Sequence, residues 1–102
     1  MSILVKEWFY KDVQIKAQKY NWTLVWERAE AEVVNLLYPN VNEDCFFLVG
    51  KKIKETEKAI EFSLDYWDLN KSGRYVTDAP KKNGFKCWIP KSVIVNLNVL
   101  KD

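Results

Sequence analysis

The sequence predicts an α+β fold in which one or two N-terminal helices pack on a four-stranded antiparallel sheet. Between residues 5 and 38, apolar residues recur at three- and four-residue intervals, which is typical of amphipathic helices. From residue 45 onward, apolar runs and strict alternation replace that spacing, which indicates strands. We therefore expect one domain over residues 1–102, with a helical layer at 1–44 and an antiparallel β part at 45–102.

The helical layer is predicted to contain a break at Asn21-Trp22-Thr23, where Thr23 would cap a second helix. Val33 and Leu37 would lie on the apolar face of that helix. Pro39 ends it, because the residue before a proline disfavours helical backbone. The pattern fits either two helices or one bent helix, and residues 3–5 are compatible instead with a short edge strand.

The β part begins with the apolar run 45–49, typical of a strand buried on both faces. A bulge or bend is expected at 50–54, and the alternation at 60–66 predicts a second strand. The polar residues 68–83, which include Gly73 and Pro80, predict a long surface loop.

Two further strands are predicted at 84–89 and 93–99. Pro90-Lys91-Ser92 separates them, because proline cannot donate a hydrogen bond to the ladder. We expect Trp88 to be a core residue that covers the sheet where the helices pack.

The composition favours a core that holds without disulfides or cofactors. Five Trp, five Tyr and five Phe can bury a large area in a domain of this size. Cys45 and Cys87 lie in apolar runs and are expected to be free and buried, with a disulfide between neighbouring strands as the alternative. The chain has no histidine and no CxxC motif, so no metal site is expected.

Nothing in the sequence points to catalysis or to a membrane. Without histidine the commonest general base is missing, and Lys91-Ser92 lacks the supporting groups of a Ser-Lys nucleophile. The N-terminus has only three consecutive apolar residues, too few for a signal peptide or a membrane span. We expect a cytoplasmic, non-enzymatic protein, and its oligomeric state stays open.

Charge is distributed unevenly and suggests an anionic partner. Residues 1–44 carry five basic and seven acidic side chains (net −2), whereas residues 45–102 carry eleven basic and seven acidic ones (net +4). Basic residues interleaved with aromatic ones suit phosphate contacts combined with base stacking, so we expect DNA or RNA to bind the β part. The candidate site residues are Lys51, Lys52, Lys54, Lys58, Trp67, Arg74, Tyr75, Lys81, Lys82 and Lys86.

Two short motifs carry a resemblance. Thr56-Glu57-Lys58-Ala59-Ile60 and Trp88-Ile89-Pro90-Lys91-Ser92 resemble a paired T-E-K-A and W-I-P-K-S pattern found in small bacterial, plasmid and phage proteins. The resemblance covers residues 45–95, and the 68–83 loop departs from it, since the pattern has a tight hairpin there. The Ile-Pro-Lys-Ser break is also similar to the 3₁₀ turn before the last strand of SH3-like barrels. These resemblances imply a barrel-like sheet and no catalytic residues.

The alternative function is protein–protein interaction. A small chain rich in Trp and Tyr suits a factor that occupies a partner surface, such as a phage- or plasmid-encoded inhibitor or accessory subunit. Glu27, Glu30 and Glu32 would form an acidic helix face for a host or phage protein. Such a face is more commonly just solvated.

Overall fold

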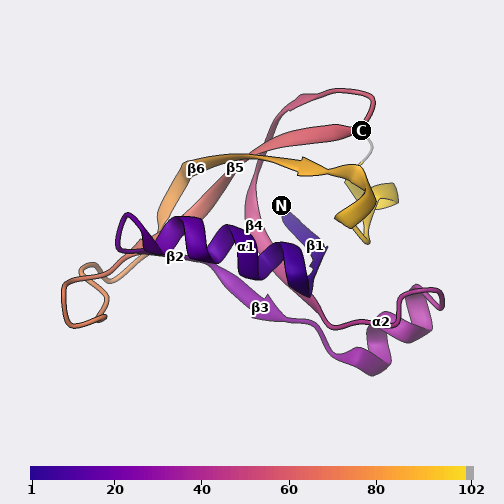
Figure 1. Ribbon diagram of the computed structural model, residues 1–102, viewed down its shortest axis with the longest axis horizontal. Coiled ribbons are helices and arrows are strands. Elements are labelled where there is room, and N and C mark those ends of the chain that lie inside the picture. Colours follow the sequence, from indigo (N-terminus) through magenta and orange to yellow (C-terminus); the bar gives the residue numbers. More distant parts are fainter. Residues whose placement is uncertain (101–102) are drawn as a thin grey trace.

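The computed structural model describes residues 1–100, in which two α-helices and six strands confirm the α+β class (Figure 1). Residues 101 and 102 of the expected domain lie outside this described range. The elements in chain order are β1 (Ser2–Lys6), α1 (Glu7–Gln18), β2 (Trp22–Leu24), β3 (Trp26–Arg28), α2 (Ala31–Leu37), β4 (Cys45–Glu55), β5 (Ala59–Asp68), β6 (Lys81–Pro90) and the 3₁₀ turns η1 (Lys91–Val93) and η2 (Leu97–Leu100).

Strand β4 connects two parts of an antiparallel sheet. In its first half Leu48 pairs with Ile3 of β1 on one side and with Trp26 of β3 on the other. In its second half β4 pairs with β5, which also pairs with β6. The β4–β5 hairpin separates beyond Gly50 and Leu64, and residues 22–28 fill the resulting fork by pairing β2 with β5 and β3 with β4.

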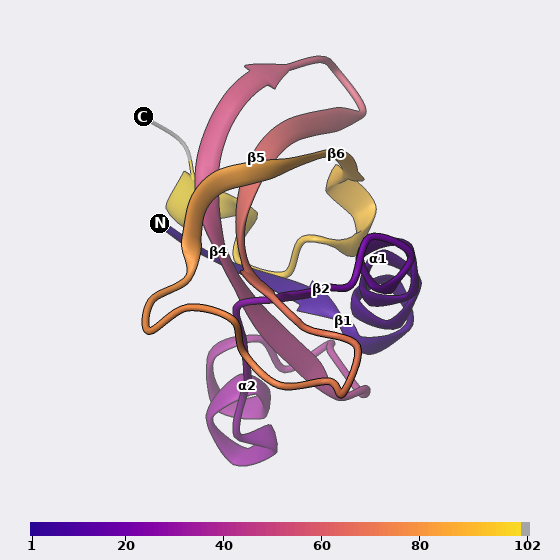
Figure 2. The ribbon, with the colours of Figure 1, turned by 90° about the vertical axis from the view of Figure 1, so that its left-hand side faces the viewer.

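The main core lies between α1 and one face of this sheet. Phe9, Val13 and Ala17 of α1 pack with buried side chains of five strands, and α1 lies beside β1 and β2 in Figure 2. A second, smaller core on the opposite face of β1 and β4 is formed by Leu4, Ala29, Val34 and Cys45, and α2 contributes to it. The sheet therefore has an inner face towards α1, and its other face is called here the outer face.

The predicted helical layer at 1–44 is confirmed only in part, because it holds both α-helices of residues 1–100 but also three of the six strands. Residues 3–5 form part of β1, as the alternative interpretation allowed. The helix predicted from Thr23 is replaced by β2 and β3, and only residues 31–37 are helical. The fork in the sheet explains this difference, since its buried backbone groups need strand partners, and the backbone N–H of Val25 donates to the Asp65 carbonyl.

The strand predicted at 93–99 is also wrong, since η1 and η2 occupy most of it. Only one bridge forms, between Val5 and Ile94. Strand pairing stops there because the side-chain oxygen of Asn96 accepts the hydrogen bond from the Leu4 N–H, at 2.9 Å. A side chain thus replaces the backbone carbonyl that a continuing strand would supply.

The middle of the β part agrees more closely with the sequence. The expected bulge is confirmed by a register shift between Lys52 and Lys54. Both neighbouring strands are longer than predicted, so the connection between β5 and β6 shortens to residues 69–80. That connection folds on itself through a bridge between Leu69 and Tyr75.

Candidate nucleic-acid interface

The alternation of β5 separates two chemically different faces. Ile60, Phe62 and Leu64 are buried in the main core on the inner face. The intervening residues point to the outer face, and these are Glu61, Ser63, Asp65 and Trp67. The pairing register then determines which side chains of β4 and β6 lie beside them.

Two rows of side chains cross the outer face. Lys54 of β4 and Trp88 of β6 flank Glu61, while Lys51 and Lys86 flank Ser63 in the next row. Paired strands lie about 4.8 Å apart, so each row brings its three side chains together. With Lys82 and the Trp67–Tyr75 pair at the far end, these form what we call the outer stripe: Lys51, Lys54, Trp67, Tyr75, Lys82, Lys86 and Trp88.

The prediction that Trp88 is a core residue is wrong, since 45% of its surface is exposed. Ile89 is buried and Cys87 packs against the core, so the residue between them points outward. The helix expected to cover Trp88 packs on the inner face instead. A signal for this was present in the sequence, because Trp88 is two residues from Lys86 and so shares its face.

Three lysines of the outer stripe form no ion pair with another described residue, although Glu61 lies beside Lys54 in the same row. Lys51, Lys54 and Lys86 are exposed and have no ion-pair partner among residues 1–100. Lys82 contacts the carboxylate of Asp65 at 3.4 Å, and Asp65 is only 3% exposed. The two rows nearest Trp88 therefore carry three lysines against one carboxylate, Glu61, which leaves an excess of positive charge.

Two of the predicted lysines are neutralised. Lys52 lies on the inner face and contacts Glu55 at 2.6 Å, and Lys91 contacts the same carboxylate at 2.6 Å. Hydrogen bonds from Lys52 and then Lys91 lower the pKa of Glu55 to about 2. Lys81 contacts Asp68 at 2.6 Å, and this hydrogen bond raises the pKa of Lys81. Neither lysine is a strong candidate for phosphate contact.

The remaining predicted residues lie at the two ends of the β4–β6 sheet. Lys58 is exposed in the turn between β4 and β5. At the opposite end, the rings of Trp67 and Tyr75 stack with centroids 4.5 Å apart and an interplanar angle of 15°. Tyr75 is 61% exposed, and Arg74 precedes it on the same loop. Tyr75 thus presents an exposed ring on this loop, whereas Trp67 lies in β5 and is only partly exposed.

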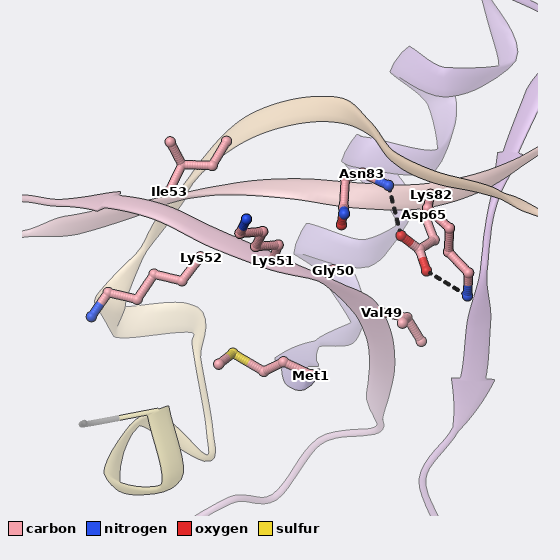
Figure 3. Close-up of a pocket in the computed structure, with 9 residues that line it drawn as sticks. All are labelled: Met1, Val49, Gly50, Lys51, Lys52, Ile53, Asp65, Lys82 and Asn83. Carbon is pink, nitrogen blue, oxygen red and sulfur yellow. Dashed lines mark hydrogen bonds and ion pairs between the residues drawn. The ribbon is translucent and has the colours of Figure 1, made fainter.

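A groove of about 670 Å³ adjoins the outer stripe where β1 begins beside β4 (Figure 3). Its lining includes Lys51, Lys52 and Lys82 beside the buried Asp65. Asp65 also accepts a hydrogen bond from the Asn83 N–H at 2.8 Å, which holds the carboxylate in place. Within the groove, Lys82 is thus paired with a fixed carboxylate and Lys52 with Glu55, which leaves Lys51 as the lining lysine without an ion pair among residues 1–100.

The two cysteines are not activated for covalent chemistry. Burial raises the pKa of Cys87 to about 12 and also raises that of Cys45, so neither thiol is an activated nucleophile. Both cysteines are free, with Cys45 buried as expected and Cys87 only partly so. Within residues 1–100 there is no group of three metal-ligating side chains and no helix long and apolar enough to span a membrane.

The three glutamates proposed as an acidic helix face do not share a helix. Glu27 lies in β3, Glu30 precedes α2, and only Glu32 is helical. The helix itself presents a different feature, because the expected core residues Val33 and Leu37 are 48% and 64% exposed, and Leu36 is 80% exposed. This apolar surface borders a groove of about 350 Å³ between α2, β3 and η2.

Comparisons with protein-family models, with curated proteins and with solved structures find no match to this chain. The candidate site therefore rests on its own geometry and charge.

Proposed function

We propose that this protein is a non-catalytic module that binds nucleic acid through the outer stripe. The observation that carries the proposal is that Lys51, Lys54 and Lys86, which form no ion pair with residues 1–100, share two neighbouring rows with the exposed ring of Trp88, where Glu61 is the one carboxylate. Lysines supply phosphate contacts, and an exposed indole supplies a stacking surface for a base.

We also propose that the sheet is an open relative of the SH3-like barrel. The long β4 takes part in both halves of the sheet, as a barrel strand at a corner does. The turn η1 precedes the bridge from Ile94 to Val5, which joins the chain end to the first strand. This arrangement supports the proposed function only by analogy, because one fold serves many functions.

The direct test measures fluorescence anisotropy of labelled DNA and RNA, both single-stranded and duplex, with the full chain. We expect binding that weakens steeply as salt rises, because released counterions drive the association. Lys51→Glu combined with Lys86→Glu should weaken binding about tenfold or more, since two phosphate contacts become repulsive.

The matched control is Lys16→Glu combined with Lys19→Glu. Both lysines are exposed on or next to α1, away from the outer stripe, and the net charge change is the same. If both double variants lose the same affinity for nucleic acid, the loss would come from the overall charge alone, which would contradict the proposed site. No binding to any of the four nucleic acids would contradict the proposed function.

The second candidate function is protein interaction, favoured by the exposed apolar surface of α2. Leu36 and Leu37 follow Val33 by three and four residues, so each lies next to Val33 on the helix surface. Apolar side chains grouped beside a groove are typical of protein contact surfaces. A chain that binds no nucleic acid in the anisotropy test would favour this candidate, including the interpretation as a phage or plasmid inhibitor or accessory subunit.

A further inference from the structure

We infer that the outer stripe binds single-stranded nucleic acid, over a stretch of about six nucleotides or fewer, with one base stacked at each end. This inference rests on the proposed function and deepens it. It starts from the positions of the exposed aromatic rings, which lie at the two ends of the outer stripe, with lysines between them.

The separation of the aromatic ends follows from β5. Trp88 lies beside Glu61, whereas the ring of Tyr75 stacks on Trp67, six residues further along the same strand. At about 3.3 Å per residue the two ends are about 20 Å apart along β5. A stacked strand rises about 3.4 Å per nucleotide, so about six nucleotides span this length, and a more extended strand needs fewer.

The charges between the two ends define a path for the backbone. Lys51 and Lys86 flank the strand on either side, and neither is in an ion pair with any residue from 1 to 100. The carboxylates on this face, Glu61 and Asp65, lie along the centre line of β5. Phosphates are therefore favoured beside the lysines at the margins, while uncharged bases can lie over the centre.

The same arrangement disfavours a duplex. Base pairs in a duplex are already stacked, so their faces cannot reach Trp88 and Tyr75 without unpairing. Reading a duplex instead requires a helix or a two-stranded ribbon that enters the major groove. The outer stripe is the face of a three-stranded sheet and presents neither element.

The test uses the full chain with labelled oligothymidylates of three, six and twelve nucleotides and a twelve-base-pair duplex, by anisotropy at low salt. After correction for the number of binding registers, we expect affinity to rise at least tenfold from three to six nucleotides and then level off. The duplex should bind at least tenfold more weakly than the twelve-nucleotide strand.

Variants test the two stacking ends. Trp88→Ala should weaken binding of the six-nucleotide strand at least fivefold, the lower limit for loss of one stacked base. Tyr75→Ala tests the other end with the same expectation, and it keeps the test decisive if Trp88→Ala disturbs the fold. Trp8→Ala is the matched control, because Trp8 is 52% exposed on α1 and should leave binding unchanged.

The outcomes separate this inference from the proposed function. Suppose that the duplex binds as tightly as the single strand and that the Lys51→Glu and Lys86→Glu double variant loses this binding. This inference would then be overturned, while the proposed function would stand. Equal affinities for three and six nucleotides, or Trp88→Ala and Tyr75→Ala variants that bind like Trp8→Ala, would also overturn it. Absence of binding to every oligonucleotide would overturn this inference, and the proposed function falls as well only if none of the four nucleic acids of the first test binds.

Discussion

Glu55 shows how one side chain decides the role of its neighbours. Its carboxylate contacts Lys52 and Lys91, each at 2.6 Å, and so ties β4 to the turn that follows β6. These contacts lower the pKa of Glu55 to about 2, well below its ordinary value of 4.5. A carboxylate with a depressed pKa stabilises the fold above its ordinary pKa, and that contribution is lost as the pH falls towards about 2.

Glu55→Gln should therefore flatten the acid dependence of stability. We expect the melting temperature of the wild-type protein to fall more between pH 5 and pH 2 than that of the variant, as followed by circular dichroism. The difference should be modest and should shrink in high salt, since the side chain is 39% exposed. Glu57→Gln is the control, because Glu57 is exposed and has no ion pair within the described chain.

Wild-type and Glu55→Gln melting temperatures that decline in parallel would contradict a role for this carboxylate.

The same contacts explain why the sequence could not show which lysines of the candidate site are paired with a carboxylate and which are not. Lys51, Lys52 and Lys54 are equivalent by composition and spacing. The bulge in β4 and the position of Glu55 leave Lys52 neutralised on the inner face, and both depend on pairing with distant residues.

At the scale of elements, the sheet divides at Gly50, where β4 leaves β5. A Cβ atom at this position would lie 2.7 Å from the carbonyl oxygen of Ser63 and 2.9 Å from a methyl carbon of Leu64. The nearer atom belongs to the backbone and has little freedom to move. Only glycine fits this close approach of the two strands.

Gly50→Ala should destabilise the fold by about 1–3 kcal/mol, the usual cost of overpacking. Urea unfolding measures this change, and Lys51→Thr at the exposed neighbouring position should stay within about 0.5 kcal/mol of wild type. If Gly50→Ala is as stable as Lys51→Thr, then β4 and β5 can move apart at this position without loss of stability.

The predictability of the elements depends on where their partners lie. Strands β5 and β6 follow from local pattern and from the proline that ends β6, and the sequence predicts them with small errors in length. For β4 the apolar run predicts only residues 45–49, whereas the strand continues to Glu55. Strands β2 and β3 are three residues each, and they exist because the fork between β4 and β5 needs partners. Their apolar spacing also fits a helix, so local pattern cannot distinguish the two.

At the scale of the whole molecule, residues 94–96 contact β1 near the start of the chain. Val95 donates a backbone hydrogen bond to the Leu4 carbonyl, and the bridge from Val5 to Ile94 lies next to it. Asn96 completes this contact with its side chain, which accepts from the Leu4 N–H at 2.9 Å and donates to the Ser2 carbonyl at 3.2 Å. The outer stripe is built by other strands, so closure of the fold and binding should be separable.

Asn96→Ala tests that separation. The side chain is 7% exposed, and its loss leaves the N–H of the buried Leu4 without a partner, which should cost about 1–3 kcal/mol in urea unfolding. Asn98→Ala is the matched control, since Asn98 is exposed two residues later and should change stability by less than about 0.5 kcal/mol. Where both variants are folded, they should bind the six-nucleotide strand as tightly as the wild-type protein. Equal stabilities of the two variants would show that the backbone contacts of Val95 and Ile94 are enough to hold this segment against β1. Weaker binding by Asn96→Ala would show that these contacts with β1 and nucleic-acid binding at the outer stripe are coupled.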